Sequence, residues 1–173
     1  METELYKVVS SETIRVSRFE ITEDKFENKE RSYSFIRIKP GICVIIETPN
    51  GFVVLNEYRY PIKKWSYEFV AGIIDDGETP AEAAVREAKE ETGFVADSIE
   101  SLGEFYPSFG ATDEVIHLFY ARCSRHESAE HEDTELITYE IMSKDEIEDL
   151  IRTGKFKHGA GLAAWLKYLL RYK

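Results

Sequence analysis

The chain is poor in cysteine and has no long apolar run, and each shortage excludes a class of protein. Its two cysteines, Cys43 and Cys123, lie within apolar runs, which predicts reduced core residues rather than a disulfide or a nucleophile. No apolar run approaches the length needed to cross a membrane. The first residues lack the basic-then-apolar pattern of a signal peptide, so we expect a cytoplasmic protein with no membrane partner.

Basic residues are also scarce. The chain has 22 Lys and Arg against 33 Asp and Glu, and its formal net charge is -11. Because neutralising phosphates requires a basic surface, these numbers argue against nucleic acid as a partner bound through its backbone. The length of 173 residues and the hydrophobic content of 43% suit one globular domain with a proper core and a small extension.

What the chain does contain is a set of acidic residues at fixed spacing. Residues 72–94 read G-x5-E-x7-R-E-A-x-E-E-x-G-F. Thr79 and Glu82 form a capping box with proline at the first helical position, and Gly93 is placed for a left-handed C-terminal cap. These signals predict a helix from about Pro80 to Thr92.

The predicted helix carries three glutamates on one face. Glu87, Glu90 and Glu91 are related by three and four residues and repel one another unless a cation lies among them. Mg²⁺ and Mn²⁺ prefer carboxylate and carbonyl oxygens, and Mg²⁺ sites often include substrate phosphates. The alternative is a solvated acidic face, which the fixed spacing to Glu78 and Arg86 disfavours.

This stretch resembles the signature of the Nudix hydrolases, and every position of that pattern is filled. The resemblance implies cleavage of a nucleoside diphosphate linked to another moiety, with Mg²⁺ as cofactor and Mn²⁺ as the alternative. It implies Glu87 and Glu91 as the principal metal ligands, with Glu90 and the Ala71 carbonyl as further ligands. Arg86 would orient the glutamates, so Arg86, Glu87 and Glu91 are the catalytic candidates on the helix.

The remaining patterns predict an α+β fold. Two or three strands are expected within residues 12–38, around a charged turn. Further strands are expected at residues 41–47, 52–58, 65–70, 113–123 and 135–142, and helices at 143–153 and from 159 or 161 to 172. In the helix that carries the glutamates, Ala84, Val85 and Ala88 form a small apolar stripe that can pack on a sheet.

The resemblance makes this fold the Nudix α/β/α sandwich with a mixed β-sheet. It implies an N-terminal antiparallel β extension over residues 1–40 and a Nudix hydrolase domain over residues 41–173. In relatives that act on ADP-ribose, such an extension helps to build a dimer, so we expect a homodimer.

The flanking residues resemble the ADP-ribose pyrophosphatase subfamily. Residues 57–61, EYRYP, and 65–72, WSYEFVAG, resemble its QYRYP and ELPAG patterns, and residues 105–114 resemble its YPSPG loop. Val70 and Phe109 stand where these patterns have proline. The resemblance implies hydrolysis of ADP-ribose to AMP and ribose 5-phosphate. GDP-mannose or another nucleotide sugar is the alternative substrate, and a nucleotide-binding module without catalysis is the alternative of another class.

Five residues of these patterns are candidates for substrate contact: Arg59, Glu68, Tyr58, Phe109 and Glu114. The planar guanidinium of Arg59 suits pyrophosphate oxygens, and Glu68 can accept from a base amino group or a ribose hydroxyl. Tyr58 and Phe109 can stack on a base or serve in packing. An ordinary strand arginine is the alternative for Arg59, and an ion pair with a neighbouring lysine is the alternative for Glu68.

A general base is also expected, because metal-assisted attack needs a water made nucleophilic near the phosphorus. The resemblance implies a base glutamate on the loop of residues 128–135. Glu135 and Glu132 are the candidates, Glu130 and Asp133 compete with them, and a mobile acidic loop without a catalytic role is the alternative.

Overall fold

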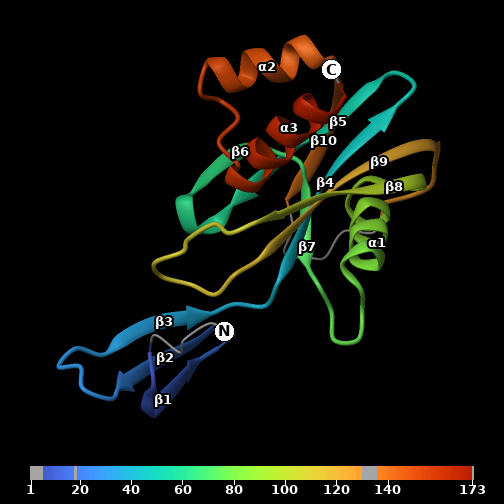
Figure 1. Ribbon diagram of the computed structural model, residues 1–173. Coiled ribbons are helices and arrows are strands. Elements are labelled where there is room, and N and C mark those ends of the chain that lie inside the picture. The colour runs from blue at the N-terminus through green and yellow to red at the C-terminus, as the bar shows by residue number, and fades with distance from the viewer. Residues whose placement is uncertain (1–5, 18, 130–135, 173) are drawn as a thin grey trace. The chain divides into compact units, whose positions relative to one another are not determined.

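The computed structural model describes residues 6–17, 19–129 and 136–172 (Figure 1). The chain divides into two compact units. The first consists of the residues up to Lys39 together with Tyr106–Val115, and the second of Pro40–Phe105 and Ile116–Lys173. The two units are described separately below.

The first unit contains a three-stranded antiparallel sheet, where the alternating pattern predicted two or three strands. Its strands are β1 (Val8–Val16), β2 (Phe19–Phe26) and β3 (Tyr33–Arg37), in that order. The loop Tyr106–Val115 adds to the β3 edge through two backbone bonds. The Ile36 N–H donates to the Ala111 carbonyl at 2.8 Å, and the Asp113 N–H donates to the Ile36 carbonyl at 3.3 Å.

The second unit contains a mixed sheet. Its strands are β4 (Gly41–Thr48), β5 (Gly51–Arg59), β6 (Lys64–Glu68), β7 (Val70–Ile73), β8 (Phe94–Phe105), β9 (Ile116–His126) and β10 (Ile137–Met142). The central order is β10-β5-β4-β9-β8, with β6 paired to β5 and β7 paired to β4. Only the pairing of β4 with β9 is parallel among the strand pairs that the structure describes.

Helices cover both faces of this sheet. They are α1 (Pro80–Thr92), α2 (Lys144–Arg152) and α3 (Gly159–Arg171), and the short 3-10 helix Tyr60–Ile62 follows β5. Alternate residues of β4 point to opposite faces. Val44 packs in the core under α1 and Ile45 in the core under α3, where Phe156 and Trp165 also lie. The expected α/β/α sandwich with a mixed sheet is therefore confirmed (Figure 1).

Three details differ from the expectations. The strand β8, with its many polar residues, was not predicted because its pattern is not apolar enough. The run 65–70 was predicted as one strand but is divided at Phe69, where pairing passes from β5 to β4. On α1, Val85 is 37% exposed and Ala83 is fully buried, so the apolar stripe is rotated by part of a turn from the predicted one.

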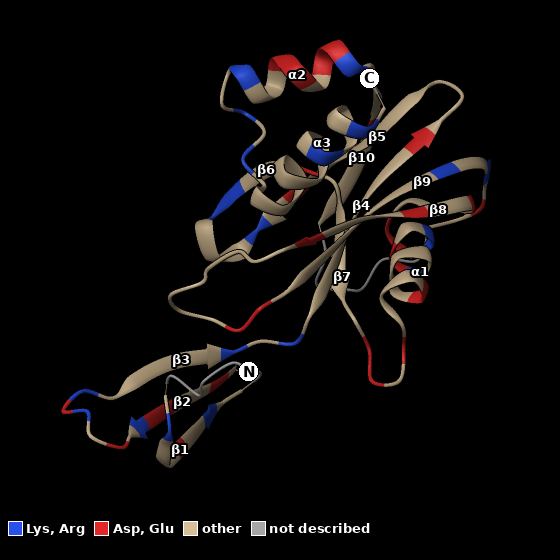
Figure 2. Cartoon of the chain, in the orientation of Figure 1, with Lys and Arg blue, Asp and Glu red and all other residues tan. Residues whose placement is uncertain are grey.

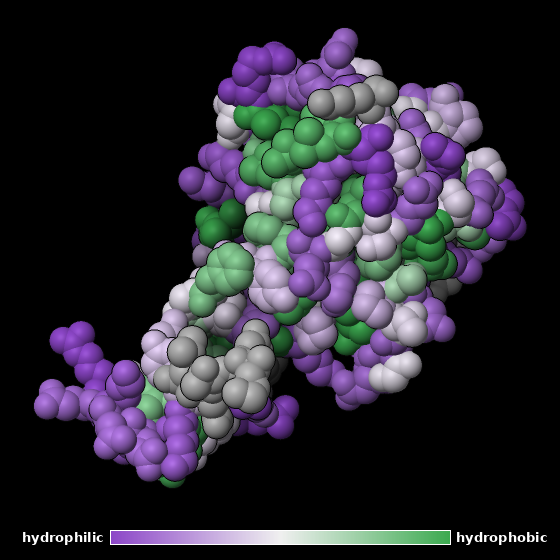
Figure 3. Space-filling model, in the orientation of Figure 1, coloured by the Kyte–Doolittle hydropathy of each residue, from purple (hydrophilic) through white to green (hydrophobic). Residues whose placement is uncertain are grey.

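Both cysteines are free and buried, which confirms the prediction of reduced core residues. Burial raises the pKa of the Cys123 thiol to about 11. Among the helices of the described residues, none is long and apolar enough to span a bilayer. The visible surface is mostly hydrophilic, with separate apolar patches, one of them over α3, where Leu166 and Leu170 are exposed (Figure 3).

Gly93 and Gly154 offer a matched test of the α1 terminus. Both have positive φ, 75° and 70°, but a Cβ at Gly93 would lie 2.2 Å from the Glu127 carbonyl oxygen, whereas a Cβ at Gly154 meets nothing within 4 Å. Gly154→Ala should lower the free energy of unfolding by about 1 kcal/mol, the cost of left-handed backbone. Gly93→Ala should lose a further ~1–3 kcal/mol through overpacking. Urea unfolding measures both, and equal losses would contradict the steric account.

Candidate active site

The helix α1 begins and ends where its local signals predicted. The Thr79 hydroxyl accepts from the Glu82 N–H, and the Thr79 N–H donates to the Glu82 carboxylate at 2.8 Å. Pro80 is the first helical residue, and Gly93 ends the helix at φ 75°. The loop from β7 to α1 and the helix itself carry a concentration of acidic residues (Figure 2). The helix thus holds its glutamates on a fixed scaffold.

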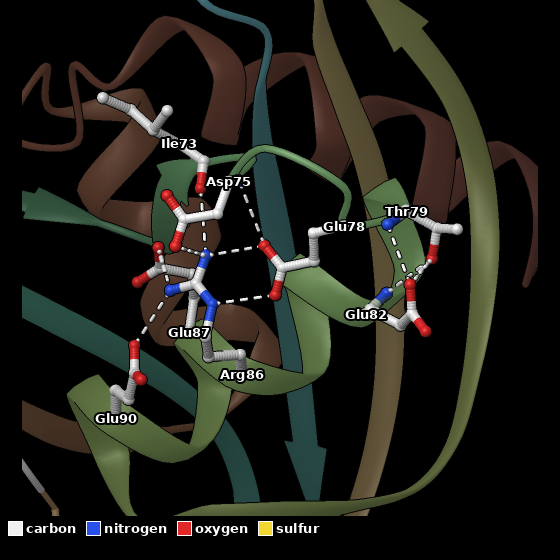
Figure 4. Close-up of polar contacts among 8 residues, drawn as sticks. All are labelled: Ile73, Asp75, Glu78, Thr79, Glu82, Arg86, Glu87 and Glu90. Atoms are coloured by element: carbon white, nitrogen blue, oxygen red, sulfur yellow. Dashed lines mark hydrogen bonds and ion pairs between the residues drawn. The ribbon is translucent and has the colours of Figure 1, made fainter.

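Arg86 lies at the centre of a network that joins three parts of the motif (Figure 4). It donates to both carboxylate oxygens of Glu78 at 2.9 and 3.0 Å, to Glu87 at 2.8 Å and to Glu90 at 2.9 Å. It also donates to the Ile73 carbonyl at 3.0 Å. One guanidinium thereby connects the end of β7, the motif loop and α1, and its hydrogen bonds lower the pKa of Glu78.

The three helix glutamates differ in their exposure. The Glu90 side chain is 43% exposed and that of Glu87 is 15% exposed, while Glu91 as a whole is only 5% exposed. The backbone of β7 lies close to the Glu87 carboxylate. A Cβ added at Gly72 would lie 2.0 Å from Glu87 Oε1. Ala71 and Gly72 therefore lie beside the carboxylates, and a side chain at residue 72 would displace the Glu87 carboxylate.

These residues fit a hard divalent cation by their chemistry. Glu87, Glu90 and Glu91 offer only oxygen donors, and Gly72 leaves room for the backbone of β7 beside them. Within the part of the chain that the structure describes, no three His, Cys, Asp or Glu side chains are gathered as a metal-binding group. Arg86 instead donates to Glu87 and Glu90. Rotation of these carboxylates would be needed to face a common ion.

A second arginine lies between two buried carboxylates. Arg59 donates to Glu68 through Nε at 3.0 and 3.1 Å and through Nη2 at 2.6 Å, and its Nη1 is 2.9 Å from Glu57 Oε1. Glu68 is 3% and Glu57 8% exposed. Burial lowers the pKa of Arg59, but the hydrogen bond and charge of Glu68 and the charges of Glu57 and Glu91 outweigh this effect and raise it.

The two arginine networks belong to the same face of the sheet. Leu55 is part of the core that α1 covers, and Glu57 and Arg59 follow it at intervals of two along β5. The charge of Glu91 on α1 also acts on Arg59. The partner of Glu68 is Arg59, and not a neighbouring lysine, among the described residues.

Comparison with known proteins identifies the family. A family model described as the NUDIX domain matches residues 37–165. The chain belongs to the Nudix family. The helix α1 and the loop before it carry its Nudix motif, and Arg86 links the two.

Relatives with known names support the family assignment. A methanol dehydrogenase activator of Bacillus methanolicus is 34% identical over 67% of this chain and 65% of its own length. An ADP-ribose pyrophosphatase of Bacillus subtilis is 31% identical over 66% of this chain and 65% of its own length. A GDP-mannose pyrophosphatase of Yersinia enterocolitica is 32% identical over 62% of this chain and 56% of its own length. The Nudix chain thus matches less than two thirds of the length of each of these relatives.

A solved structure shares the fold over nearly the whole chain. The crystal structure of an ADP compounds hydrolase superposes with a TM-score of 0.82 and covers 99% of this chain and 95% of its own, at 23% sequence identity. At that identity the likeness concerns the fold alone.

The other predicted site residues have different surroundings. Tyr58 makes an edge contact with Trp65 at 5.8 Å between ring centroids, on the face of β5 opposite to Arg59. Phe109 and Glu114 belong to the first unit. There Phe109 is 83% exposed and stacks on Tyr106 at 5.3 Å, and burial raises the pKa of Glu114.

The four loop carboxylates considered as general base, Glu130, Glu132, Asp133 and Glu135, lie outside the described residues. Two residues of the Nudix site were not expected from the sequence. Glu57 could have been noticed as a charged residue within an apolar strand, two positions before Arg59. His158 precedes α3 and has its Nδ1 3.9 Å from Glu68 Oε2. No sequence pattern connects it with β6.

Gly72→Ala tests the proximity of β7 to the glutamates. The new Cβ overlaps the end of the flexible Glu87 side chain, so the carboxylate should turn away while the fold persists. We expect Mn²⁺ affinity, measured by calorimetry, to fall about tenfold, as when a metal ligand is misoriented. The thermal midpoint should stay near that of the unaltered protein. Gly110→Ala, where a Cβ meets nothing within 4 Å, is the control. Unchanged Mn²⁺ affinity in Gly72→Ala would contradict the proposed ligand role of Glu87.

Proposed function

We propose that this Nudix protein hydrolyses the pyrophosphate bond of a nucleoside diphosphate linked to a sugar. ADP-ribose is the first candidate, with AMP and ribose 5-phosphate as products. The observation that carries the proposal is the presence of Arg59 and the glutamates of α1 on one face of the sheet. A guanidinium can donate hydrogen bonds to the diphosphate oxygens. The glutamates can bind the divalent cations that accompany a diphosphate.

The residues have separate roles in this proposal. Glu87, Glu90, Glu91 and the Ala71 carbonyl would hold Mg²⁺ or Mn²⁺, which when bound supplies positive charge that stabilises the charge developing on the phosphoryl oxygens. Arg86 bridges Glu87 and Glu90 and orients their carboxylates.

The remaining roles concern the substrate and the attacking water. Arg59 binds the diphosphate. Glu68 orients Arg59 by accepting three hydrogen bonds from it. Tyr58, Phe109 and Glu114 stay candidates for contacts to the base or sugar. Glu132 and Glu135 stay candidates for the base that takes a proton from the attacking water.

GDP-mannose is the second candidate substrate, because a relative of similar identity is a GDP-mannose pyrophosphatase. A panel of ADP-ribose, GDP-mannose and nucleoside triphosphates with Mg²⁺, resolved by chromatography, separates the candidates. Faster release of AMP from ADP-ribose than of product from the others supports the first. Binding of nucleotide without any product, in Mg²⁺ and in Mn²⁺, would reject hydrolysis and favour a binding module.

Glu91→Gln gives the catalytic control for this panel. The substitution keeps the shape of a side chain that is only 5% exposed and removes its charge. Turnover should fall by orders of magnitude with little change in the thermal midpoint, because a neutral amide is a poor ligand for a hard cation. Glu82→Gln, on the same helix but in the capping box, is the matched control and should keep most activity. Near-normal turnover in Glu91→Gln would show that the metal assignment is wrong.

We also propose that the protein is a homodimer formed through the N-terminal sheet. Ile14, Val16, Phe19 and Ile21 share one face of the β1–β2 pair and are 38–68% exposed. A small sheet with an exposed apolar face is marginally stable in water unless another surface covers it. A second copy of the chain supplies the same apolar face. The cytoplasmic location expected from the sequence stays a prediction as well.

Ile14→Glu tests this dimer. A charge at the centre of the apolar face should convert the dimer to a monomer in light scattering, because an unpaired buried charge is costly. Arg15→Gln changes the net charge by the same amount on the opposite face of β1 and should leave the dimer intact. A monomer in the unaltered protein, or a dimer that survives Ile14→Glu, would refute the proposal.

A further inference from the structure

The group around Arg59 contains more negative charge than one guanidinium can balance. Glu57 and Glu68 are both buried, and both contact Arg59. Nε and Nη2 donate to Glu68 and Nη1 contacts Glu57, so three of the five N–H donors of Arg59 are directed at protein carboxylates. A diphosphate that takes more than the two remaining donors turns the guanidinium away from Glu68.

Glu68 is the residue that this change affects most. It is 3% exposed, and Arg59 makes three contacts of 2.6–3.1 Å to its carboxylate. A buried carboxylate that loses its charged partner is strongly destabilised unless another donor replaces it. The site therefore needs a second donor beside Glu68.

His158 is in the right place to be that donor. Its Nδ1 is 3.9 Å from Glu68 Oε2, the oxygen that also accepts from Arg59 Nη2. This distance is about 1 Å beyond a hydrogen bond. The Nδ1 atom is buried and makes no hydrogen bond to a described residue, and the side chain does not cap α3.

The local fold holds the imidazole at this point. A bridge between Tyr67 and Phe156 aligns the segment before α3 with β6, which carries Glu68. Gly161 in the first turn of α3 leaves space for the ring, since a Cβ there would lie 3.1 Å from His158 Nδ1 and 2.8 Å from Phe156. The placement of His158 beside Glu68 thus follows from packing and not from a hydrogen bond already formed.

We propose that His158 is a positioning residue that donates to Glu68 when Arg59 turns to the diphosphate of the substrate. In the free protein Glu68 orients Arg59. In the complex His158 moves the remaining distance, holds Glu68 in place and takes up a proton from solvent. This inference rests on the proposed function, because it requires a diphosphate at Arg59.

The charges around His158 support this exchange. Burial lowers the pKa of His158, the charge of Glu68 raises it and that of Arg59 lowers it. The imidazole is therefore neutral in the free protein at neutral pH. When Arg59 shares its charge with a diphosphate, its effect on His158 weakens and that of Glu68 persists, so the pKa of His158 rises in the complex. Binding is then coupled to proton uptake and becomes tighter as the pH is lowered.

An NMR titration of His158 tests the inference without turnover. The histidine ring signals are followed against pH with Mg²⁺, in the presence and absence of inorganic pyrophosphate, and His158 is assigned by its loss in His158→Asn. The expected result is a rise in the pKa of His158 when pyrophosphate is bound. An unchanged titration with pyrophosphate demonstrably bound would overturn the inference.

Kinetics give the second test. The asparagine variant keeps an N–H donor but cannot take up a proton. Its KM should rise about fivefold at pH 6, the size expected when a charged hydrogen bond is replaced by a neutral one. Its KM should also lose the pH dependence of the unaltered protein. The kcat should change little. Lys157→Asn, at the exposed neighbouring residue, is the control and should behave like the unaltered protein.

The outcomes separate the two proposals. If the unaltered protein binds pyrophosphate but releases no product from any substrate, the proposed function fails and the titration still decides the role of His158. If it is active and His158→Asn keeps both its KM and its pH profile, only the role of His158 fails. Should the asparagine variant unfold, His158→Gln supplies the same comparison. In Glu68→Gln the further change at His158 should have no effect on KM, because the two residues act together.

Discussion

The network around Arg86 is the interaction on which the rest of the site depends. The side chains of Glu78 on the loop and of Glu87 and Glu90 on α1 would repel one another if no positive charge lay among them. Arg86 contacts all three and also holds the Ile73 carbonyl at the end of β7. Strand, loop and helix are therefore fixed relative to one another by one side chain. The close approach of Gly72 to Glu87 is a consequence of this connection.

The break between β6 and β7 at Phe69 positions the second arginine network. Because β6 pairs with β5 and β7 pairs with β4, residues of one continuous run serve two neighbouring sites. Glu68 at the end of β6 reaches Arg59, while Ala71 and Gly72 in β7 lie beside the glutamates of α1. Glu68 and Gly72 share a face by the alternation of side chains along a strand. The break places the diphosphate-binding and metal-binding candidates of that face on two neighbouring strand pairs.

The sequence predicted those parts of the molecule whose signals are local. The capping box at Thr79 and the glycine at residue 93 mark the ends of α1, and both lie within a few residues of what they determine. The pairing of Arg59 with Glu68 spans a hairpin, and that of Glu68 with His158 joins residues 90 positions apart along the chain. Such contacts depend on tertiary packing, and no local pattern encodes them. The same reason explains β8, whose polar residues are held in a strand by pairing with β9 and not by their own propensity.

Both arginine networks follow one electrostatic principle, and both contribute to the acidity of the protein. Each guanidinium contacts two or more carboxylates, so each network keeps an excess of negative charge close to the candidate site. A substrate diphosphate adds further negative charge, and a net charge of -11 repels it at long range. In the proposed function, affinity would come from short-range groups that redistribute positive charge on binding: the proposed cations at α1, Arg59, and the proton that we assign to His158. The acidic surface would then disfavour polyanions that bring no divalent cation and would admit those whose charge is already balanced.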